Sequence, residues 1–203
     1  RRHRWGYYRM TELVDAEIAK VLGALRKAGL EEDTLVVFTS DHGDCAGAHR
    51  FNQKTVLYEE SARVPMIVSW KGRTPAGTCD KLVNTGVDIL PTLLQSAGAE
   101  VPDRLPGRSL LPLALGKGAE AWRDFVVVQN DMCQTGDVDG LRRPNMQGRM
   151  VRSARHKYCV YSRGRRRESL VDVSRKVLLD AYGPPAVLVD EAYNELTSVP
   201  EES

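Results

Sequence analysis

The segment that decides the fold spans residues 34–65 and reads TLVVFTSDHGDCAGAHRFNQKTVLYEESARVP. Its apolar run Leu35–Phe38 predicts a strand that is buried on both faces of an α/β sheet. The strand leads directly to Asp41 and His42. Because ligands bind beyond the carboxyl ends of the strands in open α/β sheets, an acid and an imidazole at this point predict a metal-binding corner. Lys54 follows as an isolated cation. We expect its side chain to reach the same pocket and to bind an anion there.

This order of residues resembles the second metal-and-substrate segment of the sulfatases, which belong to the alkaline-phosphatase-like superfamily. The resemblance rests on the strand, D-H-G at 41–43, G-x-H at 47–49, Lys54, and Y-E-E-S-x-R-V-P-x-I at 58–67. It extends upstream through Tyr7-Tyr8 and downstream through 148–152 and 155–158. The fold it implies is α/β: the C-terminal part of an alkaline-phosphatase-like sulfatase fold, with a small antiparallel C-terminal subdomain.

The resemblance also implies roles for individual residues. Asp41 would be an oxygen ligand of a divalent cation, Ca²⁺ with Mg²⁺ as the alternative, and otherwise a turn or capping aspartate. His42 would be a further ligand, although a nitrogen donor is unusual for calcium. Lys54 would bind the substrate's sulfate and stabilise charge on the leaving group, and otherwise be a surface lysine. His49 would contact the sulfate or donate a proton, and otherwise be a plain loop histidine.

The neighbouring residues of the same motif are interpreted as structural. Tyr58 is assigned no chemistry. Either Glu59 or Glu60 is expected to pair with Arg63 through helical spacing.

The nucleophile that the resemblance implies is missing from the expected place. Sulfatases hydrolyse with a formylglycine made from a C-x-P-S-R or related motif well before D-H-G, and no such motif precedes Asp41. The string at 159–163, C-V-Y-S-R, lacks the proline and follows D-H-G, so it is interpreted as a coincidence. The family's early pair of metal-binding aspartates is absent too. The resemblance therefore identifies a C-terminal portion of a sulfatase, whose partner would be the formylglycine-bearing N-terminal half.

Hydrophobic periodicity and turn residues predict the elements around this segment. The predicted helices are an amphipathic helix at Thr11–Ala28 with Gly29 as its C-cap, a short helix at Val56–Ala62, and a core helix at Asp88–Ala97 with Pro91 in its first turn. A second buried strand is predicted at Pro65–Trp70. Short runs at 125–129, 150–153, 157–161 and 169–173 predict a small antiparallel sheet, and helical signals follow at 177–182 and 190–197.

These elements suggest a boundary near residue 120. Residues 1–120 would form the C-terminal part of the catalytic α/β domain. Residues 121–203 would form an α+β subdomain around the antiparallel sheet.

Composition sets wider limits. A chain of 203 residues with 42% hydrophobic and 28% charged residues is typical of a globular protein, and no apolar run approaches the ~20 residues of a membrane span. The basic start at Arg1–Trp5 has no signal-peptide core, so the compartment stays open. The four cysteines have neither metal-site nor disulfide-framework spacing and are predicted to be free thiols.

A basic segment at 142–167 holds ten Lys and Arg residues and no acid, within a net charge of only +2. We interpret it as a solvated or interdomain face, with an anionic ligand or nucleic acid as the alternatives. Tyr158 and Tyr161 are its only aromatic residues, which is too few for base stacking, so a nucleic acid partner is not favoured.

The sequence therefore predicts a sulfuric ester hydrolase in origin, acting on a small-molecule or glycan sulfate ester. This chain would supply part of the metal site and the sulfate-binding Lys54. Two alternatives stay open. One is a phosphonate or phosphate ester hydrolase of the same superfamily, and the other is a non-catalytic remnant whose basic face binds an anion.

We expect the 203-residue chain on its own not to hydrolyse an aryl sulfate, because no formylglycine precursor is placed to attack sulfur. The measurement is a turnover assay on the purified chain. Activity that survives purification and disappears in Lys54→Ala would contradict this expectation.

Overall fold

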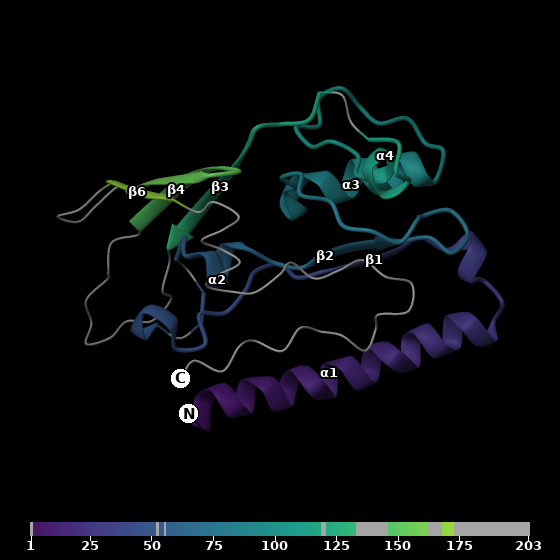
Figure 1. Cartoon of the computed structure of the whole chain (residues 1–203), viewed down its shortest axis with the longest axis horizontal. Helices are drawn as coiled ribbons and strands as arrows, with labels where there is room; N and C mark the ends of the chain where they lie inside the picture. The colour runs from purple at the N-terminus through teal and green to yellow at the C-terminus, as the bar shows by residue number, and fades with distance from the viewer. Residues whose placement is uncertain are drawn as a thin grey trace.

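The computed structural model describes residues 2–51, 53–54, 56–118, 121–132, 146–161 and 168–172 (Figure 1). Its helices are α1 (Arg2–Lys27), α2 (Glu59–Ala62), α3 (Thr85–Ser96) and α4 (Leu111–Ala114), with short 3₁₀ turns at Glu31–Asp33 and Ala48–Arg50. Its strands are β1 (Val36–Thr39), β2 (Met66–Ser69), β3 (Phe125–Met132), β4 (Met146–Ser153), β5 (His156–Tyr161) and β6 (Glu168–Asp172).

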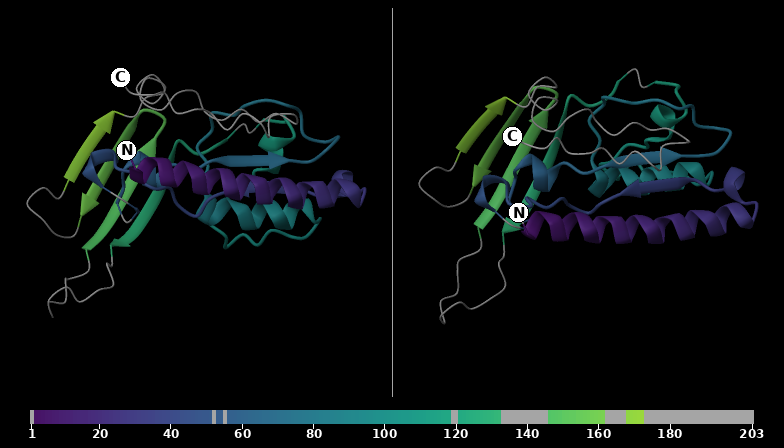
Figure 2. Two further views of the ribbon diagram at one scale, coloured as in Figure 1. Left: turned by 90° about the horizontal axis from the view of Figure 1, so that it is seen from below. Right: turned by 60° about the horizontal axis from the view of Figure 1, so that its bottom comes forward.

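Two separate sheets organise the chain. β1 pairs antiparallel with β2 in the register Val36 to Ser69 and Thr39 to Met66. β3, β4, β5 and β6 form an antiparallel sheet in sequence order, which confirms the predicted small antiparallel sheet. The β1–β2 pair lies between α1 on one side and α3 with α4 on the other (Figure 1). Figure 2 shows the four-stranded sheet at the end of the molecule where α1 begins.

Helix α1 is longer than the predicted Thr11–Ala28, since it already begins at Arg2. It ends where the sequence indicates: Gly29 has a φ of +67°, and its N–H donates to the Arg26 carbonyl at 3.0 Å. This is a left-handed residue just past a helix, a place where glycine has no steric penalty. The predicted C-cap is thus confirmed.

The prediction that the first strand is buried on both faces is wrong for the described structure. All four residues of β1 are only half-buried. A groove lined by apolar residues runs between α1 and β1, with Ile18 and Leu22 on the helix and Val37 on the strand among its walls. Because α1 stands off from the strand along this groove, the helix does not seal that face.

Helix α3 begins at Thr85 rather than at the predicted Asp88. Asn84 is its N-cap, and its side chain accepts a hydrogen bond from Gly86 N at 3.0 Å. Pro91 therefore lies inside the helix and not in its first turn, so it gives no N–H to the carbonyl of Val87. Gly107 packs against that same carbonyl: a Cβ at Gly107 would lie 1.8 Å from the Val87 oxygen. Only glycine allows this close approach.

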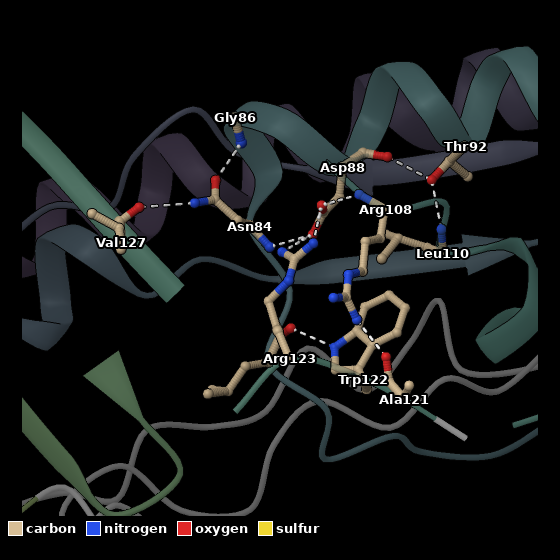
Figure 3. Close-up of polar contacts among 11 residues, drawn as sticks. Asn84, Gly86, Asp88, Thr92, Arg108, Leu110, Ala121, Trp122, Arg123 and Val127 are labelled. Atoms are coloured by element: carbon tan, nitrogen blue, oxygen red, sulfur yellow. Dashed lines mark hydrogen bonds and ion pairs between the residues drawn. The ribbon is translucent and has the colours of Figure 1, made fainter. Parts of the chain in front are cut away.

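The start of α3 is held by a fully buried carboxylate, Asp88, whose exposed fraction is 0% (Figure 3). One oxygen accepts from the backbone N–H of Asn84 at 2.7 Å, and the other from the backbone N–H of Arg108 at 2.8 Å. The Arg123 guanidinium binds both oxygens at 2.7 Å in a bidentate pair. Residues from α3, from the connection after it, and from the approach to β3 therefore meet on a single side chain.

Further contacts surround this carboxylate (Figure 3). Thr92 Oγ donates to the Asp88 carbonyl at 2.6 Å and accepts from Leu110 N at 2.8 Å. The Trp122 indole donates to the Leu82 carbonyl at 2.7 Å. The predicted subdomain boundary near residue 120 thus lies beside residues that bond back to the first part of the chain.

A second set of contacts joins the four-stranded sheet to the segment before α2. Leu57, Met150 and Cys159 form a buried apolar cluster. Cys45, Cys79 and Cys159 are free thiols, as predicted, and Cys133 lies outside the described residues.

Some sequence predictions fall outside the described residues: the helices at 177–182 and 190–197, and the basic positions at 142–145 and 162–167. In the part of the chain that the structure describes, no helix has the length and apolar character needed to cross a membrane.

We predict that Asp88→Ala lowers the free energy of unfolding by about 3–5 kcal/mol, because it leaves the Arg123 guanidinium, 14% exposed, without its counter-charge. Urea denaturation measures the loss. Glu17→Ala is the control, since the Glu17–Lys20 pair is exposed on α1 and should contribute less than about 1 kcal/mol. Equal losses in the two variants would show that the buried Asp88–Arg123 pair contributes no more to stability than an exposed pair.

Candidate functional site

The candidate site begins at the carboxyl end of β1, where the sequence predicted it. Asp41 and His42 follow Thr39 after a single residue, Ser40. The Ser40 hydroxyl donates to the His42 carbonyl at 2.6 Å, and the backbone N–H of His42 donates to Asp41 Oδ1 at 2.9 Å. These short-range bonds hold the turn so that both side chains lie together.

The His42 ring is held between backbone and side chains. Its Nδ1 lies 2.8 Å from the Gly43 carbonyl, which can only accept, so Nδ1 carries the proton. Its Nε2 lies 2.6 Å from Lys54 Nζ and 3.3 Å from Asp41 Oδ2. An ammonium group can only donate, so Nε2 offers its lone pair to Lys54. The structure thus brings Asp41, His42 and Lys54 together.

Two acceptors face each other in this corner, namely Nε2 of His42 and the carboxylate of Asp41. Two lone pairs 3.3 Å apart repel unless a cation lies near both, and the Lys54 ammonium is that cation here. A backbone carbonyl on the other ring nitrogen is also the usual way in which a metal-binding histidine is oriented. The corner is therefore built to attract positive charge.

Asp41 stays ionised over a wide pH range. Partial desolvation raises the pKa of Asp41, but the hydrogen bonds from backbone N–H groups, that of His42 first, and the charge of Lys54 together outweigh it, so its pKa lies below the ordinary value. The side chain is 81% exposed. Asp41 thus presents the carboxylate form, which is the form that binds cations.

The divalent cation expected from the sequence can be tested against this donor set. A carboxylate oxygen and a histidine nitrogen with a fixed tautomer fit as two ligands, but calcium takes six to eight. Across the described residues, no group of three or more His, Cys, Asp and Glu side chains is arranged to hold a metal ion. Asp41 and His42 therefore fit as part of a metal site and do not make a complete one.

The loop between the D-H-G turn and Lys54 has an unusual backbone. Four of its residues other than glycine have positive φ, namely Ala46, His49, Arg50 and Gln53. Such conformations persist only where surrounding contacts enforce them, and here Cys45 N donates to the Gln53 carbonyl at 2.9 Å. Cys45 is buried, and burial followed by the charges of Glu60 and Asp44 raises its pKa, so its thiol stays protonated.

His49 has different neighbours from the Asp41–His42–Lys54 corner. Its ring stacks on Tyr58 with centroids 4.0 Å apart, and its Nε2 lies 3.2 Å from the Glu60 carboxylate. These contacts direct the imidazole towards α2. Neither of these contacts involves Lys54, so the predicted role of His49 with the sulfate stays a prediction.

One charged cluster near the site was not predicted from the sequence. Glu59, expected as an alternative partner of Arg63, is instead buried against Lys157, whose Nζ lies 3.2 Å from Glu59 Oε1, and against Arg152 at 3.6 Å. A signal existed in the sequence: Lys157 is two residues from Cys159, so both point to the same face of β5. A lysine in phase with a buried residue needs a buried acid.

The sulfatase family model matches residues 2–99. Arylsulfatase K of Rattus norvegicus is 36% identical over 160 residues, which cover 78% of this chain and 27% of that protein.

Two solved structures are similar to most of this chain. One, a 2-O GAG sulfatase, has a TM-score of 0.68 at 32% identity and covers 80% of this chain and 34% of its own. The other, a phosphonate monoester hydrolase from Silicibacter pomeroyi, has a TM-score of 0.67 at 26% identity and covers 79% of this chain and 32% of its own.

The chain thus spans about a third or less of the length of these proteins. The family generally uses a metal ion and a formylglycine. The family match includes the whole D-H-G corner and Lys54. This chain belongs to the sulfatase family, within the alkaline-phosphatase-like superfamily.

Proposed function

We propose that the protein, at its full coding length, is a sulfuric ester hydrolase to which this chain contributes part of the metal site and the sulfate-binding lysine. The observation that carries the proposal is the meeting of Lys54 Nζ, Nε2 of His42 and the Asp41 carboxylate at the end of β1. A fixed cation beside two cation-attracting donors suits a tetrahedral dianionic or monoanionic ester group. Residues 1–120 belong to the catalytic domain in this proposal, and residues 121–203 form its C-terminal subdomain.

Asp41 and Nε2 of His42 would hold the divalent ion, Ca²⁺ with Mg²⁺ as the alternative, which requires that Lys54 release the one lone pair of Nε2. When bound, the ion supplies positive charge that neutralises the sulfate oxygens. The side chains themselves have two tasks: Asp41 stays ionised because of its lowered pKa, and the Gly43 carbonyl keeps Nδ1 of His42 protonated so that Nε2 faces the site.

Lys54 is the proposed sulfate ligand. Its ammonium group is exposed and lies at the corner, so it can bind a sulfate oxygen without breaking any core contact. In the transition state, charge builds on the leaving oxygen, and a preorganised cation stabilises that charge more strongly than it stabilises the ground state.

His49 is proposed as a second polar group at the substrate, which contacts the sulfate or donates a proton to the leaving oxygen. Glu60 and Tyr58 support this proposal because they hold the ring in one orientation. The nucleophile is assigned to no residue of this chain.

The proposed substrate is a sulfate ester of a glycan or of a small molecule. The solved 2-O GAG sulfatase supports the glycan class, and the phosphonate monoester hydrolase points to the competing reaction. Assaying the full-length protein on sulfate and phosphonate monoesters side by side tests the proposal. A preference for the phosphonate, or no turnover of either ester, would reject the proposed function.

We predict that Lys54→Ala in the full-length protein lowers turnover about 10²- to 10³-fold, equivalent to ~3 kcal/mol of transition-state stabilisation. The thermal midpoint should hardly change, because Lys54 is exposed and its removal opens no cavity. Lys81→Ala, also an exposed lysine, is the control for loss of surface charge. Near-normal turnover in Lys54→Ala would remove the sulfate-binding role.

Asp41→Ala should behave differently from Lys54→Ala. Its defect should be partly recovered by excess calcium, because a weakened ion site refills by mass action. The defect of Lys54→Ala should not respond, since calcium does not replace a lost sulfate contact. The measurement is turnover across a calcium titration for both variants. An identical calcium response would mean that the two residues do not divide the work between metal and sulfate.

A further inference from the structure

Helix α2 stands between the D-H-G turn and the four-stranded sheet, and its backbone touches the turn directly. Gly43 N donates to the Ser61 carbonyl at 2.9 Å. A Cβ at Gly43 would lie 1.9 Å from the Glu60 carbonyl oxygen, so only glycine allows this packing. Any displacement of α2 therefore displaces the turn that carries Asp41 and His42.

The other side of α2 is bound to the sheet through buried charges. Lys157 Nζ donates to the Leu57 carbonyl at 3.1 Å and to Glu59 Oε1 at 3.2 Å. The guanidinium of Arg152 lies 3.6 Å from Glu59 Oε2. Glu59 and Lys157 are 8% and 5% exposed, so these interactions are largely shielded from water.

The groups to which Lys157 bonds show how it orients the start of α2. Leu57 and Glu59 flank the entry to α2, and Lys157 bonds to both, so one ammonium group fixes the direction in which the chain enters the helix. Leu57 is also three residues after Lys54. The same contact therefore fixes the chain three residues beyond the proposed sulfate ligand.

Stability alone does not explain such a cluster. Replacing a buried ion pair by apolar residues of similar size is often neutral or even stabilising, because desolvation of the charges offsets their attraction. Directed hydrogen bonds provide what apolar packing does not, which is a single orientation of the groups they join.

We propose that Lys157 and Arg152 are positioning residues of the candidate site. Through Glu59 and the Leu57 carbonyl they set the place of α2. Through the Gly43–Ser61 bond, α2 then sets the place of the turn that carries Asp41 and His42, and so how that corner faces Lys54, which bonds to Nε2 of His42. The catalytic consequence rests on the proposed function, but the geometric restraint does not.

The test uses three variants of the full-length protein. Lys157→Met removes the ammonium and leaves Glu59 buried with less counter-charge, so its thermal midpoint should fall. Glu59→Gln/Lys157→Met removes both charges, while Arg152 keeps its bond to the Ser153 carbonyl and can donate to the new amide oxygen, so this variant should regain much of that loss. Lys71→Met is the matched control, because the Lys71–Glu31 pair is also short, at 2.6 Å, but exposed and remote from α2.

Turnover of a sulfate ester is the first readout. We expect Glu59→Gln/Lys157→Met to stay about 10- to 100-fold below wild type in turnover despite its recovered midpoint, because small displacements of catalytic groups have effects of this size. Lys71→Met should match wild type. A double variant that regains both stability and turnover would mean that the cluster only stabilises the fold, and would overturn the proposal.

Amide hydrogen exchange over residues 41–63 is the second readout and needs no activity. Exchange of the Gly43 amide should be faster in the double variant than in wild type or Lys71→Met, since the acceptor at Ser61 is less well held. Unchanged exchange there would refute the positioning role. If wild type hydrolyses no sulfate ester but exchange changes as expected, the proposed function fails while the positioning inference stands.

Discussion

The Asp88 carboxylate is the constraint on which the arrangement of the chain depends. A charge that is 0% exposed has lost its water shell, and the cost is offset only if every oxygen lone pair finds a donor. Those donors come from the N-terminus of α3, from Arg108 and from Arg123. Since all must reach one group, the start of α3, the connection after it and the approach to β3 have a single mutual placement.

Glu59 provides a second junction of the same type at α2. There the donors come from the sheet itself, through Lys157 on β5 and Arg152 on β4. A sheet held at one point can swing in any direction about it, whereas contacts at two separated points leave it only rotation about the line that joins them. The two buried carboxylates thus restrict how the antiparallel sheet lies relative to β1 and to the site at its end.

Part of this structure followed from the sequence because it depends on local rules. The strands of the antiparallel sheet and the end of α1 at Gly29 were predictable. Alternation of apolar and polar residues and a left-handed C-cap both depend only on residues that are close in sequence. The corner of Asp41 and His42 was predictable for the same reason, as both residues directly follow the strand.

What was missed depends on contacts across long stretches of chain. Helical spacing favoured a local partner for Glu59, but Lys157, 98 residues away, forms the buried pair. The start of α3 was placed at Asp88 because the apolar spacing begins just after it and Pro91 then falls in the first turn. Its burial depends on Arg123, 35 residues on, which no local pattern indicates.

The candidate corner is exposed to solvent, and this exposure weakens the electrostatic interactions on which its chemistry would depend. Asp41 is 81% exposed and Lys54 is exposed as well, so their mutual attraction acts through water and is weakened accordingly. The same screening would weaken a contact between Lys54 and a sulfate. Electrostatic catalysis is strong only where water is excluded and the dipoles are fixed in advance. The buried junctions at Asp88 and Glu59 fix the geometry of the corner. Residues that exclude water from it would make its positioned charges effective in catalysis.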